Sequence, residues 1–215
     1  MNGTRSGGFA GIAFVALSVV WAILVVAGDR PDYDSSSAAI SEYWGDSGKR
    51  VLSLFGAIAL SFAGLALLWF LGSLRIILRR AEGEPARLAT IAFAGGVVMA
   101  ALLYVKNAID GGLALAFEFG EQGAQDIMLD PEVFRALDAF FVGLLIHEAF
   151  AAAVLIGAAS LLVLRTGLFP RWLGWAGVVV ALLEFASWLV YGAPLILALA
   201  WILVASLLML RRAPG

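Results

Sequence analysis

Five ionisable residues lie inside stretches that are otherwise apolar. Their side chains are the candidates in this sequence for chemical function. They are Lys106, Asp110, His147, Glu148 and Glu184. A charge placed in hydrocarbon costs several kcal/mol unless it is paired or hydrated, so each side chain requires a partner, a proton or a ligand. Groups of these types suit proton transfer, the binding of an ion, or acid–base catalysis.

Glu184 is the strongest single candidate, because Leu183 and Phe185 flank it and it falls near the middle of its predicted span. An acid at that depth is protonated, paired with a cation such as Lys106 or His147, or functional. We hypothesise an outward-facing polar pocket that binds or moves a small polar solute, an ion or a proton. The candidate ligand-binding or proton-binding residues are Glu184, His147, Glu148, Lys106, Asp110, Asn107 and Tyr191, with Ser187 as a further neutral partner.

Each candidate also has a structural explanation. Lys106 and Asp110 are four residues apart, a spacing that predicts an ion pair on one helix face, with the lysine extended towards the lipid headgroups. His147 and Glu148 point about 100° apart on a helix, so hydrogen bonds to neighbouring helices explain them as well as a shared pocket does. The sequence leaves both explanations open.

The sequence predicts no metal, no cofactor and no nucleic-acid partner. His147 is the only histidine and the chain has no cysteine, which excludes thiolate chemistry and disulfides. A metal site from His147, Glu148, Glu184 and Asp110 has no second histidine at a ligand spacing. No phosphate-binding loop, dinucleotide fingerprint or nucleic-acid-binding patch is present, so no catalytic residue is assigned and a non-enzymatic function is favoured.

The composition points to a membrane as the solvent for most of the chain. Of 215 residues, 62% are hydrophobic and only 14% are charged, and apolar runs of about 18 or more residues recur. We predict an all-α, polytopic helical bundle in a single membrane domain, residues 1–215. The predicted transmembrane helices, about six, cover residues 9–27, 51–76, 88–110, 138–164, 172–190 and 194–210. The first run is longer than a usual signal-peptide core, so we expect a retained helix.

Polar segments separate the first three predicted spans. Residues 28–50 contain five acids and are expected to form an outer loop with a short helix over about 38–44. The pair Gly111-Gly112 weakens helix propensity, so we expect the third helix to end there and a second outer loop to cover 111–130.

A strong helix start follows at Asp130-Pro131-Glu132. The aspartate can cap free backbone amides, proline suits the first helical position, and glutamate complements the helix dipole. We therefore expect a helix from about Pro131 to Leu164, longer than the bilayer requires.

Basic residues predict the orientation. Most of them fall on one side of the predicted topology, namely Arg5, Arg75, Arg79, Arg80, Arg87, Arg165, Arg171, Arg211 and Arg212, while Arg30, Lys49, Arg50 and Arg135 lie opposite. The positive-inside rule makes the richer side cytoplasmic, with both termini on it. We expect a multi-pass protein of the plasma membrane of a bacterium.

Several motifs resemble uncharacterised actinobacterial membrane proteins, a family with a domain of unknown function. They are Pro31-Asp32-Tyr33-Asp34-Ser35, Ile40-Ser41-Glu42-Tyr43-Trp44, the segment Leu68 to Arg75, Arg80-Ala81-Glu82-Gly83, and Leu168 to Gly174. The resemblance covers most of the chain and implies a six-helix fold. It implies no activity and no site residues.

Two other functions remain open. A non-catalytic scaffold or accessory subunit would use these charges structurally, with the lipid bilayer, a second copy of the chain or a membrane complex as partner. An intramembrane enzyme acting on a lipid would use Glu148 or Glu184 as acid–base and His147 as an assisting group.

Overall fold

The computed structural model describes residues 3–119, 130–190 and 194–212 of the chain. Within these ranges every regular element is a helix and none is a strand. The helices are α1 (Gly3–Ala27), α2 (Ser37–Gly45), α3 (Ser47–Glu82), α4 (Arg87–Phe119), α5 (Pro131–Thr166), α6 (Arg171–Glu184), α7 (Ser187–Val190) and α8 (Leu195–Arg212). The predicted all-α fold is confirmed.

Four of the helices, α1, α3, α4 and α5, are long and apolar enough to cross a membrane. Their surfaces suit a lipid environment, because large apolar side chains such as Phe55, Phe62 and Trp69 on α3 remain exposed. The helices α6 and α8 are apolar but shorter, with 14 and 18 residues.

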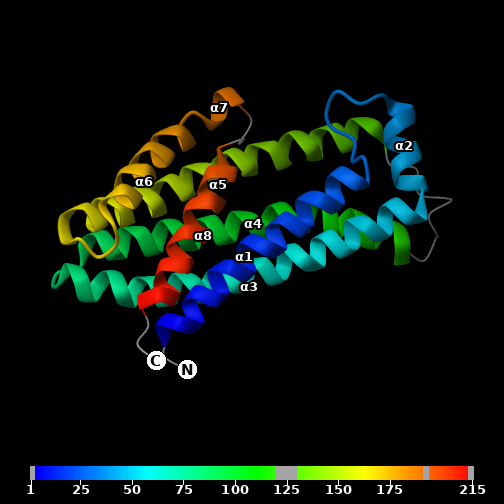
Figure 1. The fold of residues 1–215 in the computed structure, drawn as a ribbon. Helices are drawn as coiled ribbons and strands as arrows, with labels where there is room; N and C mark the ends of the chain where they lie inside the picture. The colour runs from blue at the N-terminus through cyan, green and yellow to red at the C-terminus, as the bar shows by residue number, and fades with distance from the viewer. Residues whose placement is uncertain (1–2, 120–129, 191–193, 213–215) are drawn as a thin grey trace.

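The six larger apolar helices form a closed ring. Each packs on the next in the order α1, α3, α4, α5, α6 and α8, and α8 returns to α1 (Figure 1). The ring is held by a continuous core in which small residues such as Ala63 and Ala152 let the helices approach closely, while Leu67, Phe70 and Leu155 fill the centre. Both described ends of the chain lie at the same end of the bundle (Figure 1).

The hairpin of α6 and α8 closes the ring over only part of its length. At about 1.5 Å per residue, α6 is about 21 Å long and α8 about 27 Å, whereas α3 and α5, with 36 residues each, reach about 54 Å. Beyond the hairpin the bundle therefore consists of α1, α3, α4 and α5, with α2 packed across their far ends (Figure 1).

The far end has a small hydrophobic core of its own. Trp44 of α2 stacks on Phe117 of α4 and packs against Phe134 of α5, and Ile40 is fully buried beside them. The predicted short helix at 38–44 is thus confirmed as α2, and it ties the long helices together where the hairpin is missing.

The predicted end of a helix at Gly111-Gly112 is wrong, because α4 continues to Phe119. A Cβ atom on Gly111 would lie 3.0 Å from Cβ of Ala57 on α3. This glycine serves close packing of two helices, and that packing outweighs its cost of about 1 kcal/mol in helix propensity. The predicted outer loop 111–130 is therefore helical to residue 119, and 120–129 lie outside the described residues.

The start of α5 is as predicted. Asp130 accepts a hydrogen bond from the amide of Glu132, Pro131 is the first helical residue, and Glu132 lies in the first turn.

The single helix predicted over 172–190 is wrong. Helix α6 ends at Glu184, and α7 begins at Ser187 after a tight turn in which the amide of Ala186 donates to the carbonyl of Leu183.

Candidate functional site

Lys106 and Glu148 form an ion pair in the interior of the bundle. Lys106 Nζ on α4 donates to Glu148 Oε2 on α5 at 2.5 Å, and the two residues are 3% and 4% exposed. The ammonium group also lies 5.3 Å from the ring centroid of Trp21 and 5.8 Å from that of Phe141, where cation–π attraction replaces part of its lost hydration. The pair joins two helices that are adjacent in the ring.

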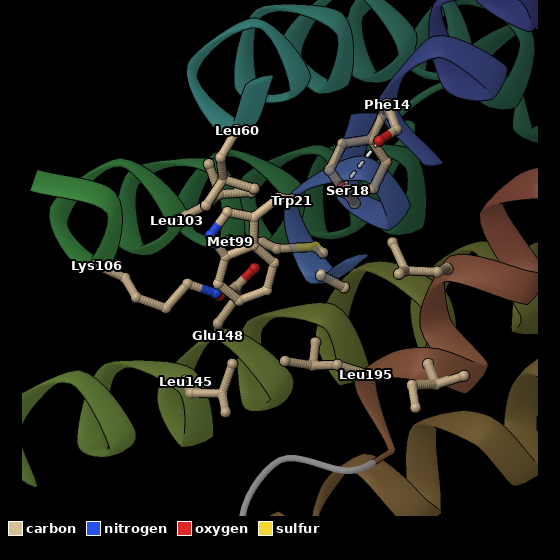
Figure 2. Close-up of a pocket in the computed structure, with 13 residues that line it drawn as sticks. Phe14, Ser18, Trp21, Leu60, Met99, Leu103, Lys106, Leu145, Glu148 and Leu195 are labelled. Carbon is tan, nitrogen blue, oxygen red and sulfur yellow. Dashed lines mark hydrogen bonds and ion pairs between the residues drawn. The ribbon is translucent and has the colours of Figure 1, made fainter. Parts of the chain in front are cut away.

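A cavity of about 280 Å³ lies against this pair. Figure 2 shows Lys106 and Glu148 pointing toward each other beside Trp21 and Met99, with Leu195 of α8 across the space. The cavity lies between α1, α3, α4, α5 and α8, at the level where α8 begins. Most of its walls are apolar, and its lining residues are Phe14, Ser18, Trp21, Ala22, Leu60, Met99, Leu103, Lys106, Leu145, Glu148, Leu195, Ile196 and Leu199.

Glu184 lies at the end of α6, fully buried. Neither of its carboxyl oxygens has a hydrogen-bond partner of good geometry among the described residues. The backbone of Ala198 on α8 is close enough to interact with it, and Glu148 is close enough for the two carboxyl groups to repel each other when both are charged. Lys106, Glu148 and Glu184 therefore form one electrostatically connected group, called here the inner cluster.

Asp110 belongs to a different group. Its carboxylate receives two hydrogen bonds from Arg30, from Nε at 3.0 Å and from Nη2 at 2.8 Å. The remaining guanidinium nitrogen, Nη1, donates to Asp138 on α5 at 2.8 Å and to the carbonyl of Pro31. Arg30, Asp110 and Asp138 are called the outer cluster. The predicted ion pair of Lys106 with Asp110 is wrong, since each has a partner on another segment.

The outer cluster is electrostatically well matched. Phe141 and Phe134 flank the Arg30 guanidinium, with ring centroids 4.9 Å and 5.8 Å away. Burial by itself lowers the pKa of Arg30, but the charges and hydrogen bonds of Asp110 and Asp138 outweigh it and raise the pKa above its usual value. Arg30 thus fastens the connection between α1 and α2 onto α4 and α5 as a permanent cation.

Asn107 faces away from the inner cluster. Its side-chain amide donates to the carbonyl of Ala57 and to the hydroxyl of Ser61, both on α3. These bonds join α3 to α4 and explain the residue structurally. Its Oδ1 atom is buried without a hydrogen-bond partner among the described residues.

His147 is exposed at the surface of α5 rather than directed into the bundle. Its Nδ1 atom lies 2.7 Å from the carbonyl oxygen of Gly143, and its ring meets the edge of Trp188. As expected for adjacent helical positions, it and Glu148 do not share one pocket. Ser187 is fully buried, without a hydrogen-bond partner among the described residues, and Tyr191 lies outside the described part of the chain.

The candidates do not converge on a metal site. In residues 3–119, 130–190 and 194–212, no three histidine or carboxylate side chains are grouped so as to hold an ion. The exposed His147 and the Arg30-bound Asp110 are directed away from Glu148 and Glu184.

Sequence reasoning missed three residues. Arg30, Asp138 and Trp21 were not among the predicted site residues, yet Arg30 and Asp138 belong to the outer cluster and the ring of Trp21 lies beside the Lys106 ammonium of the inner cluster. The sequence signal that could have found them was an excess of acidic over basic residues. Asp110 and Asp138 fall near the same end of the bundle, where few cations are available to pair with them.

Comparison with protein-family models, with curated proteins and with solved structures finds no match for this chain.

Proposed function

We propose that this chain is a multi-pass protein of a bacterial plasma membrane that binds a proton, or a small cation in its place, at the carboxyl groups of the inner cluster. The observation that carries the proposal is the burial of Glu184 without a hydrogen-bond partner among the described residues. An ionised carboxylate is costly in that position, and a proton is the simplest ligand that removes the charge.

Glu148 is suited to exchange protons with Glu184. It lies between Lys106, its ion-pair partner, and Glu184, which its charge influences. Glu148 also lines the cavity, whereas Glu184 does not. Of the two carboxyl groups, Glu148 is therefore the one that borders open space in the bundle. The apolar walls of the cavity favour this small ligand over a larger polar solute.

The proposed topology has six membrane-inserted helices, with both termini in the cytoplasm. Two features support it: the described ends of the chain lie together, and the turns at that end carry Arg79, Arg80, Arg87, Arg165 and Arg171. In this arrangement α6 and α8 form a hairpin that is embedded from the cytoplasmic side, and the inner cluster lies in the outer half of the hydrocarbon.

The test compares the wild type with Glu184→Gln and with Glu132→Gln, each in lipid nanodiscs. Glu132 is a matched control because it is an exposed carboxylate on α5 whose ion-pair partner among the described residues is Arg135. Infrared difference spectra recorded during a pH titration report the carbonyl band of a protonated carboxyl group. We expect this band in the wild type and in Glu132→Gln, and its loss in a folded Glu184→Gln.

Two outcomes overturn the proposal: a band that persists in Glu184→Gln, or no such band in the wild type. Either result leaves the inner cluster as a structural element and favours the scaffold function. Displacement of the band by Na⁺ or K⁺ in the wild type alone identifies the competing cation.

A further inference from the structure

The cavity beside Lys106 fits a second kind of ligand, whose binding does not depend on proton binding at Glu184. Its volume of about 280 Å³ is close to the lower limit of ordinary ligand pockets, about 300 Å³. Of its polar lining groups, the Ser18 hydroxyl is already bonded to the carbonyl of Phe14. Lys106 and Glu148, together with the indole N–H of Trp21, are left as the polar end of an otherwise apolar space (Figure 2).

The mouth of the cavity lies between α1 and α8. Ala22 of α1 and Ile196 of α8 both line it and are both exposed, Ile196 to 71%. Around Ala22, the exposed neighbours on α1 are Val19 and Ile23, which are also apolar. Because the hairpin ends at this level, the mouth opens sideways onto a surface that faces lipid rather than water.

Lys106 has hydrogen-bonding capacity to spare. An ammonium group carries three N–H donors, and among the described residues Lys106 uses one, to Glu148. The rings of Trp21 and Phe141 attract its charge but accept no conventional hydrogen bond. A ligand that supplies an oxygen acceptor would therefore satisfy a buried donor that the protein leaves unused.

The charge of the pair selects the head of the ligand. Glu148 already neutralises Lys106, so an anionic head would bring a further negative charge into apolar surroundings next to two carboxyl groups. An uncharged hydroxyl, ester or carbonyl oxygen accepts from Lys106 without that cost. A purely apolar chain would leave the donors unpaired.

We infer that this cavity binds a single-chain amphiphile with an uncharged, oxygen-bearing head, such as a monoacylglycerol or a fatty alcohol. The head lies at Lys106 and Glu148, and the chain leaves between Ala22 and Ile196 into the lipid. The inference goes beyond the proposed proton site, because Glu184 does not line the cavity.

Native mass spectrometry of the protein released from nanodiscs tests the inference, with 1-oleoylglycerol, oleate and hexadecane as probes. Ala22→Trp fills the mouth, and Ala16→Trp is its control, since Ala16 is exposed on the same helix but does not line the cavity. The double variant Lys106→Met/Glu148→Leu removes the polar end without leaving a single buried charge.

We expect 1-oleoylglycerol to bind the wild type and Ala16→Trp alike, and Ala22→Trp about tenfold or more weakly. In the double variant its binding should fall by a similar factor, while hexadecane binding stays unchanged. Equal binding to Ala22→Trp and Ala16→Trp rules out the cavity as the site. Tighter binding of oleate, or of hexadecane, to the wild type overturns the assignment of an uncharged polar head.

Discussion

The inner and outer clusters have nearly the same composition but differ in how fully their charges are satisfied. Each contains one cation and two acids. In the outer cluster, Arg30 uses three nitrogens in four hydrogen bonds and engages both Asp110 and Asp138. Among the described residues of the inner cluster and its surroundings, Lys106 makes one hydrogen bond, to Glu148, and Glu184 receives none.

The difference follows from the chemistry of the two cations. A guanidinium is a planar fork that can hold two carboxylates at once, whereas an ammonium is a compact point charge on a flexible stem. A cluster built on arginine is suited to fasten segments together permanently. A cluster built on lysine with a surplus acid keeps a capacity for a proton or a ligand.

The largest expected effect comes from breaking the inner ion pair. Lys106→Met leaves Glu148 as a buried carboxylate beside Glu184, and we expect a loss of about 3–5 kcal/mol in the free energy of unfolding. Adding Glu148→Leu removes the stranded charge and should recover most of that loss. Reversible unfolding in detergent checks both. If the double variant is as unstable as the single one, the two residues are not coupled as the structure indicates.

A smaller effect is expected from the outer cluster. Arg30→Gln strands Asp110 and Asp138, but the side chains of Arg30 and Asp110 are 11% exposed and retain some access to water. We expect a loss of about 1.5–3 kcal/mol, as for hydrogen bonds to charged groups. Arg79→Gln, which breaks only the exposed pair with Glu84, should cost at most about 1 kcal/mol. Equal losses in these two variants would show that the outer cluster does not fasten the bundle.

The smallest expected effect is a pH dependence that is close to zero. The pKa of Arg30 is raised in the folded state. Its contribution to stability is therefore complete when the pH is below the pKa of the unfolded state, and it disappears only as the pH rises through the pKa of the folded state. Both pKa values lie above the pH range in which the protein would ordinarily be handled. The difference in melting temperature between wild type and Arg30→Gln should therefore stay constant from about pH 6 to pH 9. A difference that vanishes within this range contradicts a permanently charged Arg30.

Much of the fold could be predicted, because helical membrane segments are specified by long apolar runs and by local capping. Asp130 and Pro131 fixed the start of α5 through interactions within one turn. The extent of α4 could not be predicted in the same way, since Gly111 is accommodated by contact with Ala57, a residue distant in sequence. No proline or glycine marks the break after Glu184, so sequence gave no sign of it.

The three members of the inner cluster were predictable from sequence, but the pairing of the charged residues was not. Lys106, Glu148 and Glu184 stood out because charge inside apolar segments is costly. Helical spacing suggested Asp110 as the partner of Lys106, but that rule describes an isolated helix. In the bundle, Arg30 approaches from a connection 80 residues away and offers a better geometry than the neighbouring lysine.

The short hairpin also sets a condition on the surrounding membrane. The hydrocarbon of a typical bilayer is about 30 Å thick, whereas α6 accounts for about 21 Å. With the hairpin embedded as proposed, the lipid on that flank is expected to thin, or polar groups to sink towards Trp188, to reduce hydrophobic mismatch. On the opposite flank, the longer α3 imposes no such deformation. In the proposed topology the protein presents two different thicknesses to the bilayer, and lipids with short chains should collect preferentially beside the hairpin.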